Sequence, residues 1–393
     1  MKKCSYCLLP ETYDTIKIAD DGKSCNMCTS SQAKEHNTDW AKKKLMLDKI
    51  IEQYRGKHEY DCIIPFSGGK DSVYALYYLM TNYPGLKPLV VRFNSGFMRP
   101  VQAKNIDTVI KKLGVDFISF TPNWHVVKEL MLEAFTEKTD FCWHCHTGVY
   151  SYPLRIAVKY NTPLVFWGES LDLILGGYDF DNNSIDFEDE TRFNEVRTIG
   201  ISADDMYKRI TAKGIQLDKR DLVPYTYPTS QELKNLKYFS CCLGSFIPWD
   251  YRANTALIKE KLGWEADVIE GVPSEVNKEG AKIECWLQAS RDYIKYLKRG
   301  YGRVTQCVNF EIRNGRLTTE EGQKIINQYE GRKPYSLDIL LGYLGITEEE
   351  FNKHVQKQVM PPFVPNFDLP VADKPKDYDT WYKEDKIVNS NSK

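Results

Sequence analysis

Pro65-Phe66-Ser67-Gly68-Gly69-Lys70-Asp71-Ser72 joins a strand-like run to a helical run in this 393-residue chain. It follows the apolar run Tyr60–Ile64 and precedes Val73–Met80, in which apolar residues recur at helical spacing. A β-branched apolar run suits a strand that is covered on both faces, and the spacing after the glycines indicates a helix with one buried face. The sequence therefore predicts a strand, a glycine turn and a helix.

The glycine turn has the chemistry of a phosphate cradle. Two adjacent residues without side chains let backbone N–H groups close around an anion at the start of the helix. The helix dipole and the hydroxyls of Ser67 and Ser72 add to the attraction there. The spacing differs from that of the Walker loop. An ordinary tight turn with a helix N-cap is the structural alternative.

This loop resembles the Ser-Gly-Gly-x-Asp-Ser pyrophosphate loop of the PP-loop ATPases. Those enzymes cleave ATP between its α and β phosphates and activate an oxygen as an adenylate. The resemblance implies that the whole stretch from Pro65 to Ser72 binds ATP together with Mg²⁺. It also implies catalytic roles for Lys70 and Asp71.

The composition is that of a globular protein with two or three structural units. Apolar residues make up 42% of the chain, which is enough for a core. No apolar run reaches the roughly 18 residues of a membrane helix, and Met1-Lys2-Lys3 leads into Cys4 without a signal-peptide core. We therefore expect a cytoplasmic protein. The formal net charge of −1 counts against nucleic-acid binding, which usually goes with a basic surplus.

Strand-like and helical runs alternate after the glycine loop. The next strand-like runs are Pro88–Phe93, Val115–Phe120 and Pro163–Trp167. This alternation predicts an α/β fold with a parallel sheet. In such sheets ligands bind beyond the carboxyl ends of the strands, so the residues that follow each strand are expected to converge on the glycine loop.

Two further strand ends supply candidate nucleotide contacts. By similarity to PP-loop enzymes, Arg92, Phe93 and Asn94 are expected to clasp adenine with their backbone, and Gly168 to line the same site. Glu169 follows directly. It is either a catalytic carboxylate that holds Mg²⁺ or ammonia, or a solvated loop residue.

The first segment carries two cysteine pairs with the spacing of a zinc ribbon. Cys4-x-x-Cys7 and Cys25-x-x-Cys28 are separated by seventeen residues that contain a turn. Two such pairs supply a tetrahedral four-thiolate site for Zn²⁺. Because that site leaves no coordination position open, the expected role is structural.

A second group of cysteines lies in the predicted core. Cys142 and Cys145 form another C-x-x-C pair, and Cys241 and Cys242 follow about a hundred residues later. The group resembles the iron–sulfur site of tRNA-thiolating PP-loop enzymes, which implies a [4Fe-4S] cluster on three of these thiols. Two alternatives stay open: zinc held with His144 or His146, or buried thiols without a metal.

The expected architecture is an α/β, parallel-sheet PP-loop core (adenine nucleotide alpha hydrolase-like) with additions at both ends. Residues 1–36 form the zinc ribbon, and 37–250 form the core, beginning with a linker helix over 37–56. Residues 251–359 are helical, and 360–393 form a proline-rich extended tail. The acidic stretch 179–190 is either a loop that closes over substrate or a passive surface loop.

Two later stretches are candidates for substrate contacts. Trp249 and Asp250 combine an aromatic ring with a carboxylate, which suits sugar binding, although core packing explains most aromatic residues. The glycine-rich basic loop Lys298–Thr305 contains Arg303 and is a candidate phosphate contact.

Several motifs together resemble the N-acetyl sugar amidotransferases of surface-polysaccharide and flagellin-sugar pathways. These motifs are the cysteine ribbon, the glycine loop, Trp143-His144-Cys145, Leu243–Asp250 and Gly300–Thr305. The resemblance extends to about residue 355. It implies that ATP activates an acetamido group on a nucleotide-linked or nonulosonic-acid sugar, and that ammonia converts this group to acetamidino.

Membership of that family also implies partners. Ammonia would come from a separate glutaminase subunit through a cyclase-like ammonia-channel subunit, since no cysteine here sits in a glutaminase-like Gly-x-Cys-x-Gly setting. A tRNA thiolase is the enzymatic rival, but the basic surplus is missing and only Cys285 and Cys307 occur near the C-terminus. The second alternative function is that of a non-catalytic, nucleotide-binding subunit.

Overall fold

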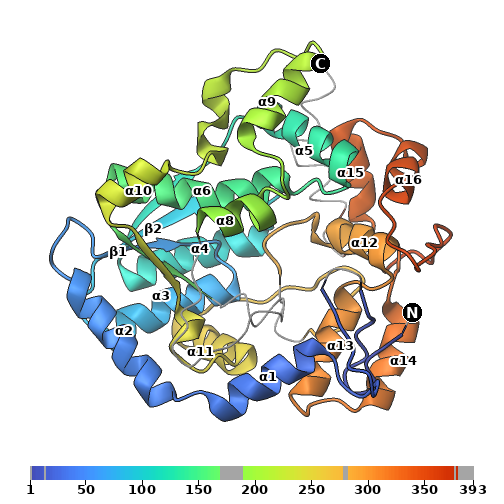
Figure 1. The fold of residues 1–393 in the computed structure, drawn as a ribbon, viewed down its shortest axis with the longest axis horizontal. Coiled ribbons are helices and arrows are strands. Elements are labelled where there is room, and N and C mark those ends of the chain that lie inside the picture. The colour runs from blue at the N-terminus through green and yellow to red at the C-terminus, as the bar shows by residue number, and fades with distance from the viewer. Residues whose placement is uncertain (1, 13–14, 169–188, 278–281, 376–377, 379–393) are drawn as a thin grey trace.

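Five parallel strands form the centre of the protein in a computed structural model that describes residues 2–12, 15–168, 189–277, 282–375 and 378. The strands lie in the order β3-β2-β1-β4-β5 (Figure 1). Their bounds are β1 (Cys62–Pro65), β2 (Pro88–Phe93), β3 (Asp116–Phe120), β4 (Leu164–Trp167) and β5 (Phe239–Cys242). The strand order reverses direction at β1, which the glycine loop follows, and such a point is where open α/β sheets bind ligands.

Helices cover both faces of the sheet because the strands are apolar on both sides. Ile64 of β1 packs with α2 (Trp40–Tyr54), α3 (Lys70–Asn82), α4 (Pro100–Leu113) and α11 (Tyr251–Leu262). Its neighbour Ile63 points to the other face, toward α6 (Trp143–Lys159) and α10 (Ser230–Leu236). The alternation of successive strand residues between two cores confirms the predicted buried parallel sheet.

A third group of helices extends the α6 side of the core. It consists of α5 (Trp124–Lys138), α8 (Glu190–Arg192), the π-helical turn Phe193–Arg197, α9 (Ala203–Ala212) and the 3₁₀ turn Lys219–Tyr225. A further 3₁₀ turn, Leu243–Ser245, follows β5. Trp143 and Tyr225 join this group to the start of α6 through a ring contact of 5.7 Å.

The C-terminal part is helical, as predicted. Its helices are α12 (Gln288–Arg299), α13 (Arg303–Arg313), α14 (Thr319–Tyr329), α15 (Ser336–Leu344) and α16 (Glu348–Gln356). Residues 360–375 have no helix or strand, and their chain returns to the helices through a bridge between Lys333 and Val371. The predicted loop Lys298–Thr305 is corrected: only Gly300, Tyr301 and Gly302 separate α12 from α13.

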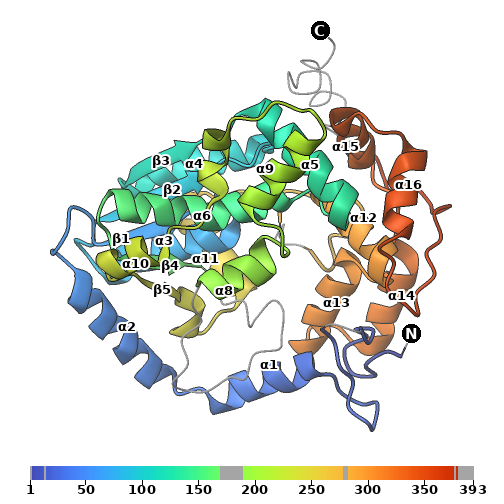
Figure 2. The ribbon, with the colours of Figure 1, turned by 45° about the horizontal axis from the view of Figure 1, so that its top comes forward.

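The N-terminal cysteine segment lies against α13 and α14 rather than against the sheet (Figure 2). Arg313 donates to the backbone oxygen of Met27 at 3.3 Å, and Leu8 packs among the apolar residues of α13 and α14. From there α1 (Asn26–Asn37) and α2 run back to the core, where the sequence had predicted one linker helix. No helix among the described residues has the length and apolar character that crossing a bilayer requires.

Candidate functional site

The glycine loop forms the turn between β1 and α3. Gly68 has a φ of +82°, which favours glycine. Its carbonyl accepts a hydrogen bond from the Trp264 indole at 3.0 Å, and Gln102 of α4 donates to the carbonyl of Ser67. The loop is therefore fixed from outside by two elements distant in sequence.

The serine hydroxyls fasten the loop from within. The Ser72 hydroxyl lies 3.2 Å from the Ser67 hydroxyl and 3.1 Å from the Gly69 carbonyl. The backbone N–H of Gly69 donates to Ser67 Oγ at 3.2 Å. These bonds hold the backbone in a curled form at the N-terminus of a 13-residue helix, the arrangement that attracts an anion.

Lys70 and Asp71 form an ion pair in the first turn of α3. Their side chains are 13% and 19% exposed, so the pair is largely shielded but reachable. The Lys70 ammonium also lies 5.5 Å from the centre of the Tyr251 ring. A cation and a carboxylate are thus both held at the loop.

The end of β4 meets the loop as predicted. A Cβ on Gly168 would come within 3.2 Å of the backbone oxygen of Asp71, so the end of β4 and the start of α3 are in close contact. The carbonyl of Gly168 accepts from Gly244 after β5 at 3.1 Å. Glu169 and most of the acidic stretch 179–190 lie outside the described residues.

The end of β2 behaves differently along its length. Arg92 is buried and donates to Asn94 Oδ1 at 3.1 Å, and burial lowers its pKa to about 10. The Phe93 ring packs in the core against Phe120 and Tyr225, which leaves only its backbone for a ligand. The Asn94 amide donates to the Thr121 hydroxyl at 3.1 Å, so the ends of β2 and β3 meet.

Glu284 is a site residue that the sequence analysis missed. A Cβ on Gly69 would lie 2.0 Å from Glu284 Oε1, so this carboxylate packs directly on the loop. Gly69 has a φ of −72°, which any residue adopts. Space for Glu284, rather than backbone conformation, therefore requires glycine at this position.

We expect Gly69→Ala to displace Glu284 from the loop. Overpacking of this kind costs about 1–3 kcal/mol. The melting temperature and nucleotide affinity should both fall. Gly342→Ala is the matched control, because a Cβ there meets nothing within 4 Å and α15 is helical. Equal melting temperatures and affinities for the two variants would contradict the contact.

The prediction that Cys241 or Cys242 joins Cys142 and Cys145 is corrected, because Cys285 lies near that pair instead. Cys142 and Cys145, at the start of α6, interact electrostatically with each other and with Cys285, just before α12. Cys142 and Cys285 also pack against the same apolar cluster. The segments are joined through the β2–α4 loop, where Phe97 accepts from the Trp286 N–H at 2.9 Å and Ser95 bonds Cys145.

Cys241 and Cys242 have other surroundings. Cys241 is fully buried on the α3 face of the sheet near Cys62, and burial raises its pKa. Cys242 points to the opposite face, among residues packed on α6. Successive strand residues face opposite sides of the sheet, so the pair is part of two cores rather than a site.

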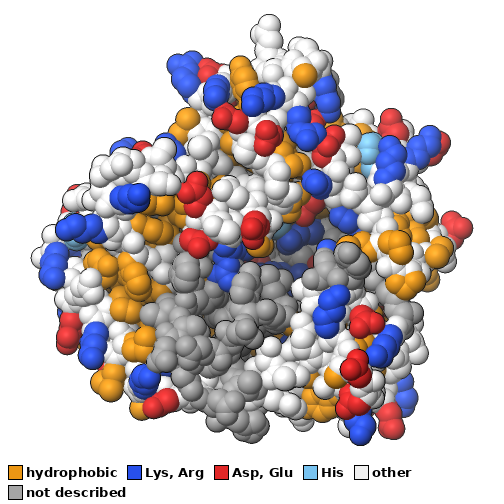
Figure 3. Space-filling view, viewed as in Figure 1, with side chains coloured by type: hydrophobic (Ala, Val, Ile, Leu, Met, Phe, Trp, Pro, Cys, Tyr) orange, Lys and Arg blue, Asp and Glu red, His pale blue; other side chains and the backbone are white. Residues whose placement is uncertain are grey.

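Polar groups surround the trio Cys142, Cys145 and Cys285. Burial raises the pKa of Cys142, while the charge of Arg291 favours its thiolate. Burial, together with the positive charge of Arg291, lowers the pKa of His146 to about 3, so that it is a neutral imidazole at pH 7. Figure 3 shows a hollow near the middle of one face with Lys and Arg side chains inside it.

The three predicted substrate residues have local partners. The Trp249 ring packs edge-on against Tyr74 at 5.1 Å. Asp250 accepts from the backbone of Arg252 and caps α11. Arg303, at the start of α13, makes two bonds of 3.0 Å to Asp292. These roles explain the residues structurally, so their contact with substrate stays a prediction.

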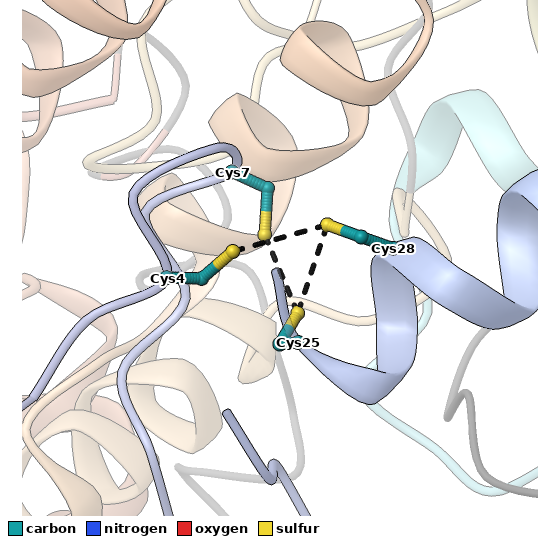
Figure 4. A group of neighbouring side chains, drawn as sticks. All are labelled: Cys4, Cys7, Cys25 and Cys28. Carbon is teal, nitrogen blue, oxygen red and sulfur yellow. Dashed lines mark hydrogen bonds between the residues drawn. The ribbon is translucent and has the colours of Figure 1, made fainter. Parts of the chain in front are cut away.

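Cys4, Cys7, Cys25 and Cys28 converge from two turns and the start of α1 (Figure 4). All four sulfurs lie within 4.8 Å of one another, and three pairs are 3.6, 3.7 and 3.9 Å apart. A tetrahedral ion with metal–sulfur bonds of about 2.3 Å places its ligands about 3.8 Å apart. The buried group therefore fits one metal ion and leaves no ligand position open.

The fold and the loop define the class of this protein: an α/β protein whose Ser-Gly-Gly-Lys-Asp-Ser loop lies at the carboxyl edge of a parallel sheet. Residues 284–390 match the family described as LPS biosynthesis protein WbpG-like, C-terminal domain. The C-terminal part of the chain is thus similar to that domain, which confirms the expected resemblance to surface-polysaccharide proteins.

Other similar proteins are distant. An uncharacterized protein of Methanocaldococcus jannaschii is 36% identical over 174 residues, covering 43% of this chain and 59% of that protein. The chain thus spans less than two thirds of this relative. The tRNA thiolase NcsA of Methanococcus maripaludis, solved with its [4Fe-4S] cluster, has a TM-score of 0.32 at 15% identity, covering 80% of this chain and 87% of that one. The NH₃-dependent NAD synthetase of Campylobacter jejuni has a TM-score of 0.28 at 12% identity, and the match covers 59% of this chain and 100% of that one.

Proposed function

We propose that this protein is an ATP-dependent amidotransferase of surface-glycan biosynthesis. Its substrate is an acetamido group on a nucleotide-linked or nonulosonic-acid sugar, and its product is the acetamidino sugar. One observation supports this most strongly: Glu284, the first residue of the WbpG-like domain, lies directly on the glycine loop. The segment that resembles a domain of LPS biosynthesis proteins therefore begins against the predicted phosphate loop, which supports the proposal.

The reaction needs ATP because an amide oxygen is a poor leaving group. The acetamido oxygen attacks the α phosphorus of ATP, and pyrophosphate leaves. Ammonia then adds to the acetamido carbon, a proton is lost to solvent, and AMP departs with the former amide oxygen. The loop N–H groups and Lys70 are placed to stabilise the charge that develops on the departing pyrophosphate. Mg²⁺, when bound, neutralises part of that charge.

Ammonia is proposed to come from a separate glutaminase subunit through a cyclase-like channel subunit. The isolated chain should therefore use ammonium and fail with glutamine. The test is product analysis with ATP, ammonium and an acetamido nucleotide sugar, where AMP and the acetamidino sugar are expected. ADP formation, or efficient use of glutamine by the isolated chain, would contradict the proposal.

We propose that Zn²⁺ occupies the Cys4, Cys7, Cys25 and Cys28 group and that an iron–sulfur cluster occupies the Cys142, Cys145 and Cys285 trio. Among the described residues, only the N-terminal four bring three or more metal-binding atoms within 4.8 Å of one another. The trio is therefore spread more widely than a single ion requires. A cluster of several irons suits such spacing, with Arg291 offsetting the thiolate charge.

Iron content tests the corrected trio. Anaerobically purified Cys285→Ser protein should lose its iron and sulfide and the broad visible absorption of a cluster. Cys241→Ser is the matched control and should keep all three. Wild-type protein without iron, or iron lost from the control and kept in Cys285→Ser, would contradict this assignment.

A further inference from the structure

An aromatic ring lies beside the lysine of the glycine loop, and the proposed reaction gives that ring no role. Lys70 is the first residue of α3, and Tyr251 is the first residue of α11. The two helices pack against each other, and the Lys70 ammonium lies 5.5 Å from the centre of the Tyr251 ring. A cation within about 6 Å of a ring centre is attracted by the negative face of the ring.

The Tyr251 ring is fixed by α13, a helix of the C-terminal part. Phe310 packs edge-on against the ring, with ring centres 4.7 Å apart, and the Tyr251 hydroxyl donates to the Glu311 carboxylate. Burial and this hydrogen bond raise the pKa of Tyr251, so its hydroxyl stays protonated and keeps donating. Two successive residues of α13 therefore hold the ring in one orientation.

Glu311 is itself held in place by two arginines. Its side chain is 2% exposed and pairs with the guanidinium groups of Arg252, in α11, and Arg316, after α13. A buried carboxylate that lacked such partners would destabilise the fold. The Arg316 guanidinium carbon also lies 5.7 Å from the centre of the Tyr251 ring. A network of opposite charges thus runs from the C-terminal helices to the ring beside Lys70.

An aromatic ring suits the task of holding this lysine. A lysine side chain has many rotamers, and confining it to one costs conformational entropy. Asp71 pairs with Lys70, but a carboxylate also cancels part of the charge that the departing pyrophosphate needs. The ring attracts the ammonium without carrying a net charge, so the positive charge of Lys70 stays available to phosphate oxygens.

We propose that Tyr251 is a positioning residue for Lys70, and that Glu311 in turn fixes Tyr251. Through this contact the segment 284–390, which resembles a domain of LPS biosynthesis proteins, acts on the glycine loop of the core. The inference rests on the proposed function, because it assumes that Lys70 stabilises the departing pyrophosphate. The structural alternative is that Tyr251 only packs α11 against α13, and it predicts a loss of activity that does not depend on Lys70.

The experiment is a double-mutant cycle between Tyr251 and Lys70 on the full chain. Tyr251→Leu and Tyr251→Met both remove the ring, so one serves if the other fails to fold, and Tyr251→Phe keeps it. Each variant is made alone and together with Lys70→Ala. AMP formation from ATP, Mg²⁺, ammonium and an acetamido nucleotide sugar gives kcat and the KM for ATP, and the melting temperature reports on the fold. Tyr207→Leu is the matched control, because Tyr207 is a partly buried tyrosine of α9 in a different apolar cluster.

Loss of the ring should lower kcat about tenfold, the size of a partly desolvated cation–π contact, and leave the KM for ATP within about twofold of wild type. Tyr251→Phe should keep kcat within about twofold of wild type, since the ring face remains. The control should match wild type. In the Lys70→Ala background, loss of the ring should have no further effect, because the group that the ring positions is gone.

An equal loss of kcat in both backgrounds would overturn the role of Tyr251 and leave the proposed function standing. The same conclusion would follow from a Tyr251→Phe protein as slow as Tyr251→Leu, or from variants without the ring that keep the kcat of wild type. Wild-type protein that forms no AMP from these substrates would overturn the proposed function and the role of Tyr251 with it.

Discussion

Lys70→Ala is expected to lower the rate of AMP formation by about 10²–10³ while leaving the fold intact. The Lys70 ammonium lies at the start of α3 beside Asp71, and its side chain is only 13% exposed. Water therefore has little access to this position and does not replace the positive charge that the substitution removes. Loss of one preorganised donor to a developing anion lowers kcat by about 10²–10³. Ser67→Ala and Asp71→Ala should act in the same direction, since Ser67 shapes the loop and Asp71 orients Lys70.

Lys111→Ala is the matched control for the loop variants. Lys111 lies on α4 with its side chain 73% exposed and pairs only with the nearby Asp107 among the contacts described. Steady-state AMP production and the melting temperature should be measured for each variant. A Lys70→Ala protein with the kcat of the control would contradict a phosphate site at the loop.

Cys25→Ser is expected to remove the N-terminal metal and unfold the segment around it. Structural zinc contributes about 10–16 kcal/mol of apparent binding free energy in zinc-finger peptides, and that energy is folding energy. The segment has a small core of its own, formed mainly by the four cysteines with Leu9, Ile16, Ile18 and Met27. Zinc should fall from about one per chain to none, and limited proteolysis should cut before α2.

A variant that lacks Cys142, Cys145, Cys241 and Cys242 is the control for the zinc measurement. It should retain about one zinc per chain, because a closed four-thiolate site needs no further ligand. If zinc is lost from this variant and retained in Cys25→Ser, the ion is bound by the core cysteines and the N-terminal assignment is contradicted. Wild-type protein without zinc would refute the N-terminal site.

The sequence predicted the features that depend on local pattern. The predicted strand runs agree with β1 to β4 to within one or two residues, since each is a short apolar run bounded by turns. The loop itself was predictable because its glycines, serines and following helix are contiguous. The N-terminal metal group was predictable because paired cysteine spacing alone defines its geometry.

The remaining features depend on contacts between distant segments. Gly300 and Gly302 indicated a loop, but Gly300 is the left-handed cap of α12, and the Glu330 carboxylate accepts from the Thr305 N–H near the start of α13. Helix α1 has no amphipathic pattern, and it begins at Cys25 and Cys28, two thiols of the candidate metal group. Neither capping by a distant carboxylate nor organisation by thiols can be read from local periodicity.

Glu284 and Cys285 were missed for the same reason. Their own stretch contains no phosphate or metal motif, and their role appears only when the turn before α12 packs beside the β2–α4 loop. One signal was present in the sequence: Glu284-Cys285-Trp286 combines a carboxylate, a thiol and an indole at the start of a helix. These side chains are reactive or polar, but three adjacent residues form no spaced motif that would identify the segments they contact.

The most direct test of the account follows the oxygen atom of the acetamido group. The full chain should be incubated with ATP, Mg²⁺, ammonium and nucleotide-linked acetamido sugars that carry ¹⁸O in the acetamido oxygen. The expected products are AMP that contains the ¹⁸O, unlabelled pyrophosphate, and a sugar in which an NH group has replaced the oxygen. ADP and phosphate as products, or AMP without the label while the sugar keeps its ¹⁸O, would contradict it.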